Sequence, residues 1–321
     1  MKRSTFTATL GAALTFPAVV GTARAEELVT VGTSRSSSDV PFFIGEKLGF
    51  FAAEGITLKL EPFDSAAKMV APLGAGQLDV AAGAPSAGLY NAVTQGIELK
   101  IVADKGSTPR GYGYMALLVR TDLIKSGKFK SMKDLKGLKV AEPAQGTSTS
   151  SSLAQAIKNT GFGYSDINHI YLGFPQHVPA FESGSIDAWV IWDPYYAAAE
   201  LSLGARAIAD GTGLAPNVAF YMASRPVAES NPEVLKAVLA AIDEIDVWIR
   251  DNRKQYAIEL APKVGLPAEV IERSVGRAEI GAHPIDAATL EGQQKIADAF
   301  ADLKLIPKPL KVTDAAWKVG E

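Results

Sequence analysis

Short apolar segments alternate with helix-like segments along most of this chain, and this alternation constrains the fold more than any other feature. It runs once from residue 28 to residue 103 and again from about residue 115 to residue 222. Strands are expected at 28–32, 56–60, 80–82, 99–103, 117–119, 139–141, 169–172, 188–191, 206–209 and 219–222, and helices at 41–53, 66–75, 86–95, 150–159, 178–182 and 194–203. This alternation predicts an α/β fold whose parallel sheets are covered by helices on both faces. Beyond residue 222 helices are expected at 232–250, 254–263, 267–277 and 287–303.

One short motif occurs twice. Residues 76–80 read GQLDV and residues 184–188, which begin 108 positions later, read GSIDA. A proline follows each copy, at Pro85 and Pro194. In both copies a glycine ends a predicted helix, an aspartate follows, and a buried strand begins. The repetition predicts two lobes of similar build.

The N-terminus has the pattern of a cleaved export signal. Lys2 and Arg3 precede an apolar stretch at 6–20, and residues 23–25 (ARA) form an A-x-A cleavage site. Because the apolar stretch is short and interrupted by glycine and proline, a membrane anchor is the less favoured alternative. We therefore predict a signal peptide at 1–25 and a periplasmic mature protein that begins at Glu26. Residues 2–6 (KRSTF) also have some twin-arginine character, so both export routes stay open.

Charge and cysteine content exclude several classes of partner. Loss of residues 1–25 lowers Lys+Arg from 32 to 29 while Asp+Glu stays at 35, so the mature chain has a net charge of −6. This acidic balance argues against binding to nucleic acid or to an anionic membrane. The chain has no cysteine, which excludes disulfides, thiol catalysis and a lipid-anchored cysteine.

Enzyme signatures are absent from the sequence. The three histidines lack metal-ligand spacing, and there is neither a P-loop nor an H-E-x-x-H motif. Ser86 lies in GAPSAG (83–88), which is not the G-x-S-x-G motif of hydrolases. We therefore expect no catalytic residue, no metal and no cofactor.

A run of hydroxyl side chains at 147–152 (TSTSSS) follows Gly146 and leads into a predicted helix. Hydroxyls, the free N–H groups of a first helical turn and the helix dipole all favour an anion at such a place. Because a helix cap needs only one hydroxyl, we interpret Thr147, Ser148 and Thr149 as an anion cradle. The alternative is a simple cap within a solvated loop.

Further candidates follow the predicted strands of the first half of the chain. Open α/β sheets bind ligands at the carboxyl ends of their strands. The residues with this position are Ser37, Ser38, Asp39, Ser65, Pro85 and Ser86. These residues lie in one crevice with the hydroxyl side chains of 147–152 only if the two lobes face each other. For residues 37–39 a flexible loop, in which Asp39 caps the next helix, is the alternative.

Aromatic and charged residues complete the predicted site. Trp192, at the end of a strand, has the position of a flat wall against a ligand. Asp193 is expected to cap the helix that starts with Pro194, and ligand contact is the alternative. Arg110 and Tyr112 lie where the first lobe passes into the second. Arg110 can pair with a carboxylate or sulfonate, and a solvated surface position is its alternative.

Several stretches of the chain together resemble one family. They are KLGFF (47–51), EGI (54–56), GQLD (76–79), DLKGLKV (134–140), FESGSIDAW (181–189), IWDP (191–194) and GAR (204–206). In this order they resemble the sulfonate/nitrate/taurine-type periplasmic substrate-binding proteins of ABC transporters, in the pyrimidine-binding-like superfamily. The resemblance implies a type II two-lobe periplasmic-binding-protein fold, with the ligand in the interlobe cleft. It implies crossing strands near 106–115 and 211–224, with lobe I at 26–110 plus 215–321 and lobe II at 111–214.

The resemblance also implies a function. The protein would be a monomer that binds a small organic anion. This anion would be a sulfonate or a carboxylate, and aromatic sulfonates and carboxylates are included. The protein would close its lobes on the anion and deliver it to an ABC permease and, through it, to the ATPase. Two alternatives stay open: a ligand-binding sensor, and a non-transport enzyme on the same fold. The export signal and the absence of cysteine count against the enzyme, because the pyrimidine-synthase relative of this fold looks like one that uses iron and cysteines.

Overall fold

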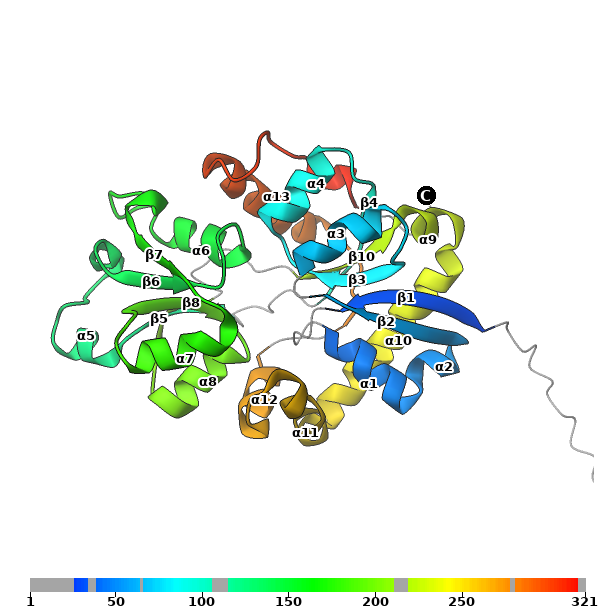
Figure 1. Ribbon diagram of the computed structural model, residues 1–321, viewed down its shortest axis with the longest axis horizontal. Helices are drawn as coiled ribbons and strands as arrows, with labels where there is room; N and C mark the ends of the chain where they lie inside the picture. The colour runs from blue at the N-terminus through cyan, green and yellow to red at the C-terminus, as the bar shows by residue number, and fades with distance from the viewer. Residues whose placement is uncertain are drawn as a thin grey trace, which may run out of the picture.

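The computed structural model describes residues 26–33, 39–63, 66–105, 115–210, 219–277 and 281–316. Within these ranges the chain forms two five-stranded sheets, and helices pack on both faces of each (Figure 1). The ten strands predicted from the alternation are confirmed. The predicted signal peptide at 1–25 lies outside the described residues, as do the candidate site residues Ser37, Ser38, Ser65, Arg110 and Tyr112.

The first sheet has the strand order β2-β1-β3-β10-β4 and, with its helices, forms what we call the first lobe. Its strands are β1 (Glu27–Thr33), β2 (Ile56–Pro62), β3 (Val80–Gly83), β4 (Leu99–Asp104) and β10 (Phe220–Ser224). Its helices are α1 (Val40–Leu48), α2 (Phe50–Ala53), α3 (Ala66–Gly74), α4 (Ala87–Thr94), α9 (Arg225–Ser230), α10 (Pro232–Asp251), α11 (Arg253–Val264), α12 (Ala268–Val275) and α13 (Ala287–Asp302). Apolar side chains of α1, α2, α10 and α11 form the core on one face of this sheet, and those of α3, α4 and α13 form the core on the other.

The second sheet has the order β7-β6-β8-β5-β9 and forms the second lobe. Its strands are β5 (Met115–Val119), β6 (Lys139–Glu142), β7 (Asn168–Tyr171), β8 (Ala188–Trp192) and β9 (Arg206–Asp210), and its helices are α5 (Thr121–Lys125), α6 (Ser148–Ala156), α7 (Phe174–Glu182) and α8 (Tyr195–Leu203). Two apolar cores again lie on opposite faces, and buried Leu117 and Leu118 of β5 point into different ones.

The two lobes share one topology, and the repeated motif explains part of it. In each sheet one antiparallel strand, β10 or β5, lies between two strands that run the other way. The sheets are therefore mixed, and the prediction of purely parallel sheets is wrong, because the chain crosses between the lobes through these two strands. Oδ2 of Asp79 accepts the N–H of Thr30 at 2.8 Å, and Oδ2 of Asp187 accepts the N–H of Lys139 at 3.0 Å. Each aspartate therefore joins the start of the third parallel strand of its lobe, β3 or β8, to the first, β1 or β6. The two copies of the motif have the same structural role.

The carboxyl ends of the parallel strands in the two lobes lie toward each other. The chain leaves the first sheet after β4 and enters the second at β5, then returns after β9 to β10. Phe220 of β10 pairs with both Gly83 and Asp104, and Met115 of β5 pairs with Trp192, so both passages join the same edges of the two sheets. The passages themselves fall at 106–114 and 211–218, outside the described residues, so the predicted lobe boundaries stay a prediction.

Several predicted helices differ from the structure in their bounds, and α7, expected at 178–182, begins four residues earlier. The single helix expected at 41–53 is divided between α1 and α2 at Gly49, whose φ of +81° suits glycine and ends α1. The helix expected from residue 150 begins earlier, at Ser148, with Thr147 as its N-cap. Part of the hydroxyl run therefore lies within the first turn of α6.

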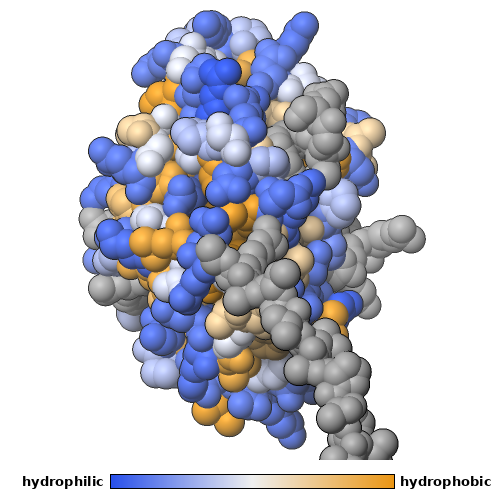
Figure 2. All heavy atoms as spheres, turned by 90° about the vertical axis from the view of Figure 1, so that its right-hand side faces the viewer, coloured by the Kyte–Doolittle hydropathy of each residue, from blue (hydrophilic) through white to orange (hydrophobic). Residues whose placement is uncertain are grey.

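Hydrophilic side chains cover much of the outer face of the first lobe, with hydrophobic ones scattered among them (Figure 2). Among the described helices, none has both the length and the apolar character needed to cross a bilayer.

Candidate functional site

The N-termini of α4 and α6 meet where the two lobes touch. The backbone N–H of Ala87, the first residue of α4, donates to the carbonyl oxygen of Gly146 at 2.9 Å. A Cβ built on Gly146 would lie 3.0 Å from the Cβ of Ala87, and Gly146 has a φ of +76°, so this contact needs glycine. The structure thus brings Pro85 and Ser86 together with Thr147, Ser148 and Thr149, as the two-lobe prediction requires.

Both helix ends favour a negative charge. Within the described residues, no protein acceptor takes the backbone N–H groups of Ser148 and Thr149. Ser86 caps α4, because its Oγ accepts the N–H of Leu89 at 3.2 Å. The hydroxyl of Thr147 makes no such cap for α6 and donates to the carbonyl oxygen of Ala144 at 2.9 Å. Two helix dipoles therefore present their positive ends at the lobe interface, which is a suitable environment for an anion.

A buried carboxylate lies beneath the N-terminus of α6 and uses part of the hydroxyl run. Oε2 of Glu142, at the end of β6, accepts the hydroxyls of Thr149 at 3.2 Å and Ser150 at 2.9 Å. Its Oε1 accepts the hydroxyl of Tyr164 at 2.7 Å and lies 2.9 Å from Nδ1 of His169. Four side chains thus occupy the acceptor sites of one carboxylate.

This network changes the expected chemistry of the cradle. Sequence reasoning assigned the hydroxyl of Thr149 to a ligand, whereas the structure directs it inward to Glu142. Ser148 is 3% exposed, and its hydroxyl makes no hydrogen bond to another described residue. The groups of α6 that remain for an anion are therefore backbone N–H groups and the Ser148 hydroxyl, and a ligand role for them stays a prediction.

The same carboxylate alters the titration of its neighbours. Burial acts to lower the pKa of His169, but the hydrogen bonds to Glu142 and to the carbonyl oxygen of Tyr164 outweigh it, and the pKa is raised above its ordinary value. Burial and the charge of Glu142 raise the pKa of the Tyr164 phenol, so this hydroxyl stays protonated and donates.

Asp193 lies at the end of β8, directly after the half-buried Trp192, and joins the lobes. Its Oδ1 accepts the N–H of Ala197 at 3.0 Å, so the predicted capping role is present, although α8 starts at Tyr195 with Pro194 in the N-cap position. The same oxygen lies 3.4 Å from Nη1 of Arg277, which follows α12 of the first lobe.

Within the described residues, the side chain of Arg277 contacts three residues of the second lobe. Besides Asp193 it pairs with Glu200 of α8, and its guanidinium lies 4.0 Å from the ring centroid of Tyr196. Burial raises the pKa of Asp193 to about 7, and the charge of Arg277 opposes that rise. No feature of the sequence indicated Arg277, because its partners lie on a different helix far along the chain.

Asp39 has the predicted N-cap position but not the predicted capping contact. It occupies the N-cap position of α1 and is fully buried, but its side chain accepts no capping hydrogen bond. Its φ of −94° and ψ of −2° are helical, whereas a capping side chain needs an extended backbone to reach the first N–H groups. The expected capping hydrogen bond is absent for this reason.

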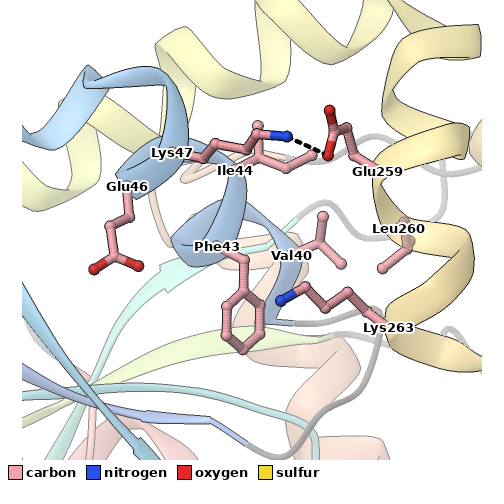
Figure 3. A pocket seen from close by; sticks show the side chains of 8 residues that line it. All are labelled: Val40, Phe43, Ile44, Glu46, Lys47, Glu259, Leu260 and Lys263. Carbon is pink, nitrogen blue, oxygen red and sulfur yellow. Dashed lines mark hydrogen bonds and ion pairs between the residues drawn. The ribbon is translucent and has the colours of Figure 1, made fainter.

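A separate pocket of about 280 Å³ lies on the first lobe between α1 and α11 (Figure 3). Lys47 pairs with Glu259 at 2.6 Å across it, and the ammonium of Lys263 lies 5.1 Å from the ring centroid of Phe43. Neither α4 nor α6 contributes a residue to it. Among the described residues, no group of three or more His, Asp or Glu side chains has the arrangement of a metal site.

Comparisons with known proteins find relatives that are named as binding proteins. The chain is 39% identical over 190 residues to the "Putative aliphatic sulfonates-binding protein" of Escherichia coli strain K12, a match that spans 59% of this chain and 59% of the relative. It is 29% identical over 274 residues to the taurine-binding periplasmic protein of the same strain, covering 81% of this chain and 79% of the relative.

Solved structures show the same fold. The periplasmic aliphatic sulphonate binding protein SsuA from Escherichia coli superposes with a TM-score of 0.78 at 31% identity, over 91% of this chain and 92% of that one. The alkanesulfonate-binding protein SsuA from Xanthomonas axonopodis pv. citri, bound to MOPS, gives 0.75 at 25% identity, over 92% of this chain and 99% of that one. The expected two-lobe periplasmic-binding-protein fold is confirmed. The NMT1-like family matches residues 22–262, most of the sequence, and the chain belongs to that family.

Proposed function

We propose that this protein is an extracytoplasmic solute-binding protein that captures a small organic anion, a sulfonate or a carboxylate, between its two lobes. One observation carries the proposal: the N-termini of α4 and α6 meet across the interface, with the N–H of Ala87 2.9 Å from the oxygen of Gly146. A charged acid group held there receives N–H groups from one helix and the dipoles of both. The relatives named for aliphatic sulfonates and taurine support this ligand class.

In this proposal the site residues have distinct roles. The backbone N–H groups of Ser148 and Thr149, with the Ser148 hydroxyl, hold the acid group. Pro85 and Ser86 fix the N-terminus of α4 opposite it, and Trp192 packs on the apolar part of the ligand. Asp39 lies on the first-lobe side of the cleft. The remaining predicted contacts are Ser37, Ser38, Ser65, Arg110, Tyr112, Thr147 and Asp193.

The protein acts as a binding component in transport and performs no reaction on its ligand. It hands the anion to a membrane permease and its ATPase from the periplasm, after removal of residues 1–25. A desulfurization enzyme, DSZB, has a related fold with a TM-score of 0.61 at 15% identity, a likeness of fold alone. Intact-mass analysis of the exported protein tests the export step: we expect a first residue of Glu26, and a soluble exported form that keeps residues 1–25 contradicts it.

Native mass spectrometry of the protein purified without refolding tests the function. A bound sulfonate or carboxylate, released on denaturation and identified by its mass, supports the proposal. A neutral or cationic molecule bound in stoichiometric amount contradicts the anion site.

A further inference from the structure

Lys105 is a buried cation at the edge of the first sheet that faces the second lobe. It directly follows β4, and only 9% of its surface is exposed. Its backbone is fixed on both sides, since its N–H donates to the oxygen of Ala219 at 3.0 Å and its oxygen accepts the N–H of Gly281 at 3.3 Å. Lys105 therefore lies beside two other parts of the chain, at Ala219 and at Gly281, and next to the segments that connect the lobes.

The ammonium of Lys105 is influenced by the charge of buried Asp39, but it makes no close contact with a partner in the described part of the chain. It forms no ion pair and donates no hydrogen bond there. Burial lowers the pKa of Lys105 to about 8, and the charge of buried Asp39 opposes this. The ammonium is therefore still the main form at pH 7, although a buried charge without a hydrogen-bonded partner is unfavourable.

The position of Lys105 relates it to the helix ends described above. Phe220 of β10 pairs with Gly83 at the end of β3 and with Asp104 at the end of β4. The ends of β3 and β4 are thus two strand spacings apart, about 10 Å. Ser86 and α4 follow β3, and Lys105 follows β4, so both emerge from the same edge of the sheet.

We propose that the ammonium of Lys105 pairs directly with the acid group of the bound anion and is the main charged determinant of selectivity for an acid over a neutral analogue. The inference rests on the proposed function and names a residue of that site. Its physical basis is the combination of burial, the lack of a hydrogen-bonded partner among the described residues, and the position at the edge where the lobes meet. The competing explanation is a structural role, in which Lys105 only balances the charge of Asp39.

The variant Lys105→Met separates these two roles. In isothermal titration calorimetry with ethanesulfonate, benzenesulfonate and benzoate, we expect the affinity for whichever anion the wild type binds to fall at least tenfold, since a charge-assisted contact is lost. The melting temperature of the unliganded variant should be equal to or above that of the wild type, because burial of the ammonium is the larger effect on Lys105 and its charge interaction with Asp39 the smaller. Lys105→Gln, which keeps a polar end, should show the same loss of affinity.

Lys100→Met is the matched control. Lys100 lies on β4, the strand that Lys105 follows, and its substitution removes the same charge. Unlike Lys105, it pairs with Glu229, at 3.3 Å. We expect wild-type affinity from it. If the wild type binds an anion and Lys105→Met binds it equally well, the inference about Lys105 is wrong and the proposed function stands. If Lys105→Met lowers the melting temperature and adding Asp39→Asn restores both stability and affinity, the role is structural. Absence of binding by the wild type to all three anions and to their neutral analogues contradicts the proposed function and, with it, this inference.

Discussion

Nη1 of Arg277, just beyond α12, lies 3.4 Å from Oδ1 of Asp193, at the end of β8. The contact joins the two lobes at a second point, apart from the meeting of α4 and α6. Helices α12 and α8 also make an apolar contact, in which Val270 of α12 packs against Ala197 and Ala198 of α8. Helix α12 thus contributes side chains to the core of the first lobe and also packs against the second lobe.

We expect Arg277→Gln to loosen the unliganded protein. The change removes a cation that contacts Asp193, Glu200 and Tyr196, all in the second lobe. Small-angle scattering should therefore give a larger radius of gyration than for the wild type. Arg273→Gln is the control: it removes a half-exposed cation whose pair with Glu200 is the kind of contact that contributes about 0–1 kcal/mol, and whose charge acts on Asp193 without a hydrogen bond to it. Equal radii for Arg277→Gln and wild type would show that this contact does not hold the lobes together.

Asp193 should make the protein less stable as the pH rises toward neutrality. Burial raises its pKa to about 7, whereas an unfolded aspartate titrates near 3.9. Between these values the folded state holds a proton that the unfolded state has lost, so the free energy of unfolding falls with rising pH. We expect urea denaturation from pH 4.5 to pH 8 to show this fall in the wild type and a smaller one in Asp193→Asn.

The exposed Asp122 supplies the control for that experiment. Its hydrogen bond to Arg120 lowers its pKa, so its own titration lies below the tested range. Asp122→Asn should therefore follow the wild-type pH dependence throughout. A curve for Asp193→Asn that also follows the wild type contradicts a raised pKa at this position.

Glu142→Gln should destabilise the second lobe. The buried carboxylate receives the hydroxyls of Thr149, Ser150 and Tyr164, and an amide cannot accept at both of its ends. We expect a loss of about 2–4 kcal/mol in the free energy of unfolding, measured by urea denaturation. Ser151→Ala, which removes a buried hydroxyl of the same helix that donates to the carbonyl oxygen of Ser148, should lose only about 1 kcal/mol. Equal losses would mean that the network adds nothing beyond an ordinary hydrogen bond.

The repeated aspartates should have matching effects on stability. Asp79 and Asp187 accept equivalent backbone N–H groups, from Thr30 and Lys139. Each alanine substitution should lower the free energy of unfolding by about 1–3 kcal/mol, because it leaves a strand N–H without its acceptor. Asparagine at either position keeps an oxygen acceptor and should lose less. A clear effect at one aspartate and none at the other would contradict their equivalence.

The sequence predicted the sheets well because local patterns determine them. Buried strands such as 80–82 and 188–191 are continuous apolar runs, and the glycines and prolines beside them are visible without a structure. The repeated motif predicted two similar lobes, and the equivalent bonds of Asp79 and Asp187 show its structural reason. The break at Gly49 was missed because the apolar periodicity continues across it.

The parts of the site that depend on distant pairs were not predictable in the same way. Arg277 and Asp193 are 84 residues apart in the chain, and Glu142 and His169 are 27 apart. The hydroxyl run showed that polar groups gather before α6, but not that Glu142 would take the hydroxyl of Thr149. A glutamate at the end of a buried strand, a few residues before those hydroxyls, was the signal available for it. Lys105 resembles an ordinary lysine until the fold shows that it is buried.

The central claim is that the meeting of α4 and α6 binds a negative charge. The most direct measurement is calorimetric titration of the mature protein with ethanesulfonate and with ethanesulfonamide, which has nearly the same shape but is neutral at pH 7. We predict that the sulfonate binds at least tenfold more tightly than the sulfonamide, since each hydrogen bond to a charged group contributes about 1.5–3 kcal/mol. Equal affinity of the two compounds would contradict the account.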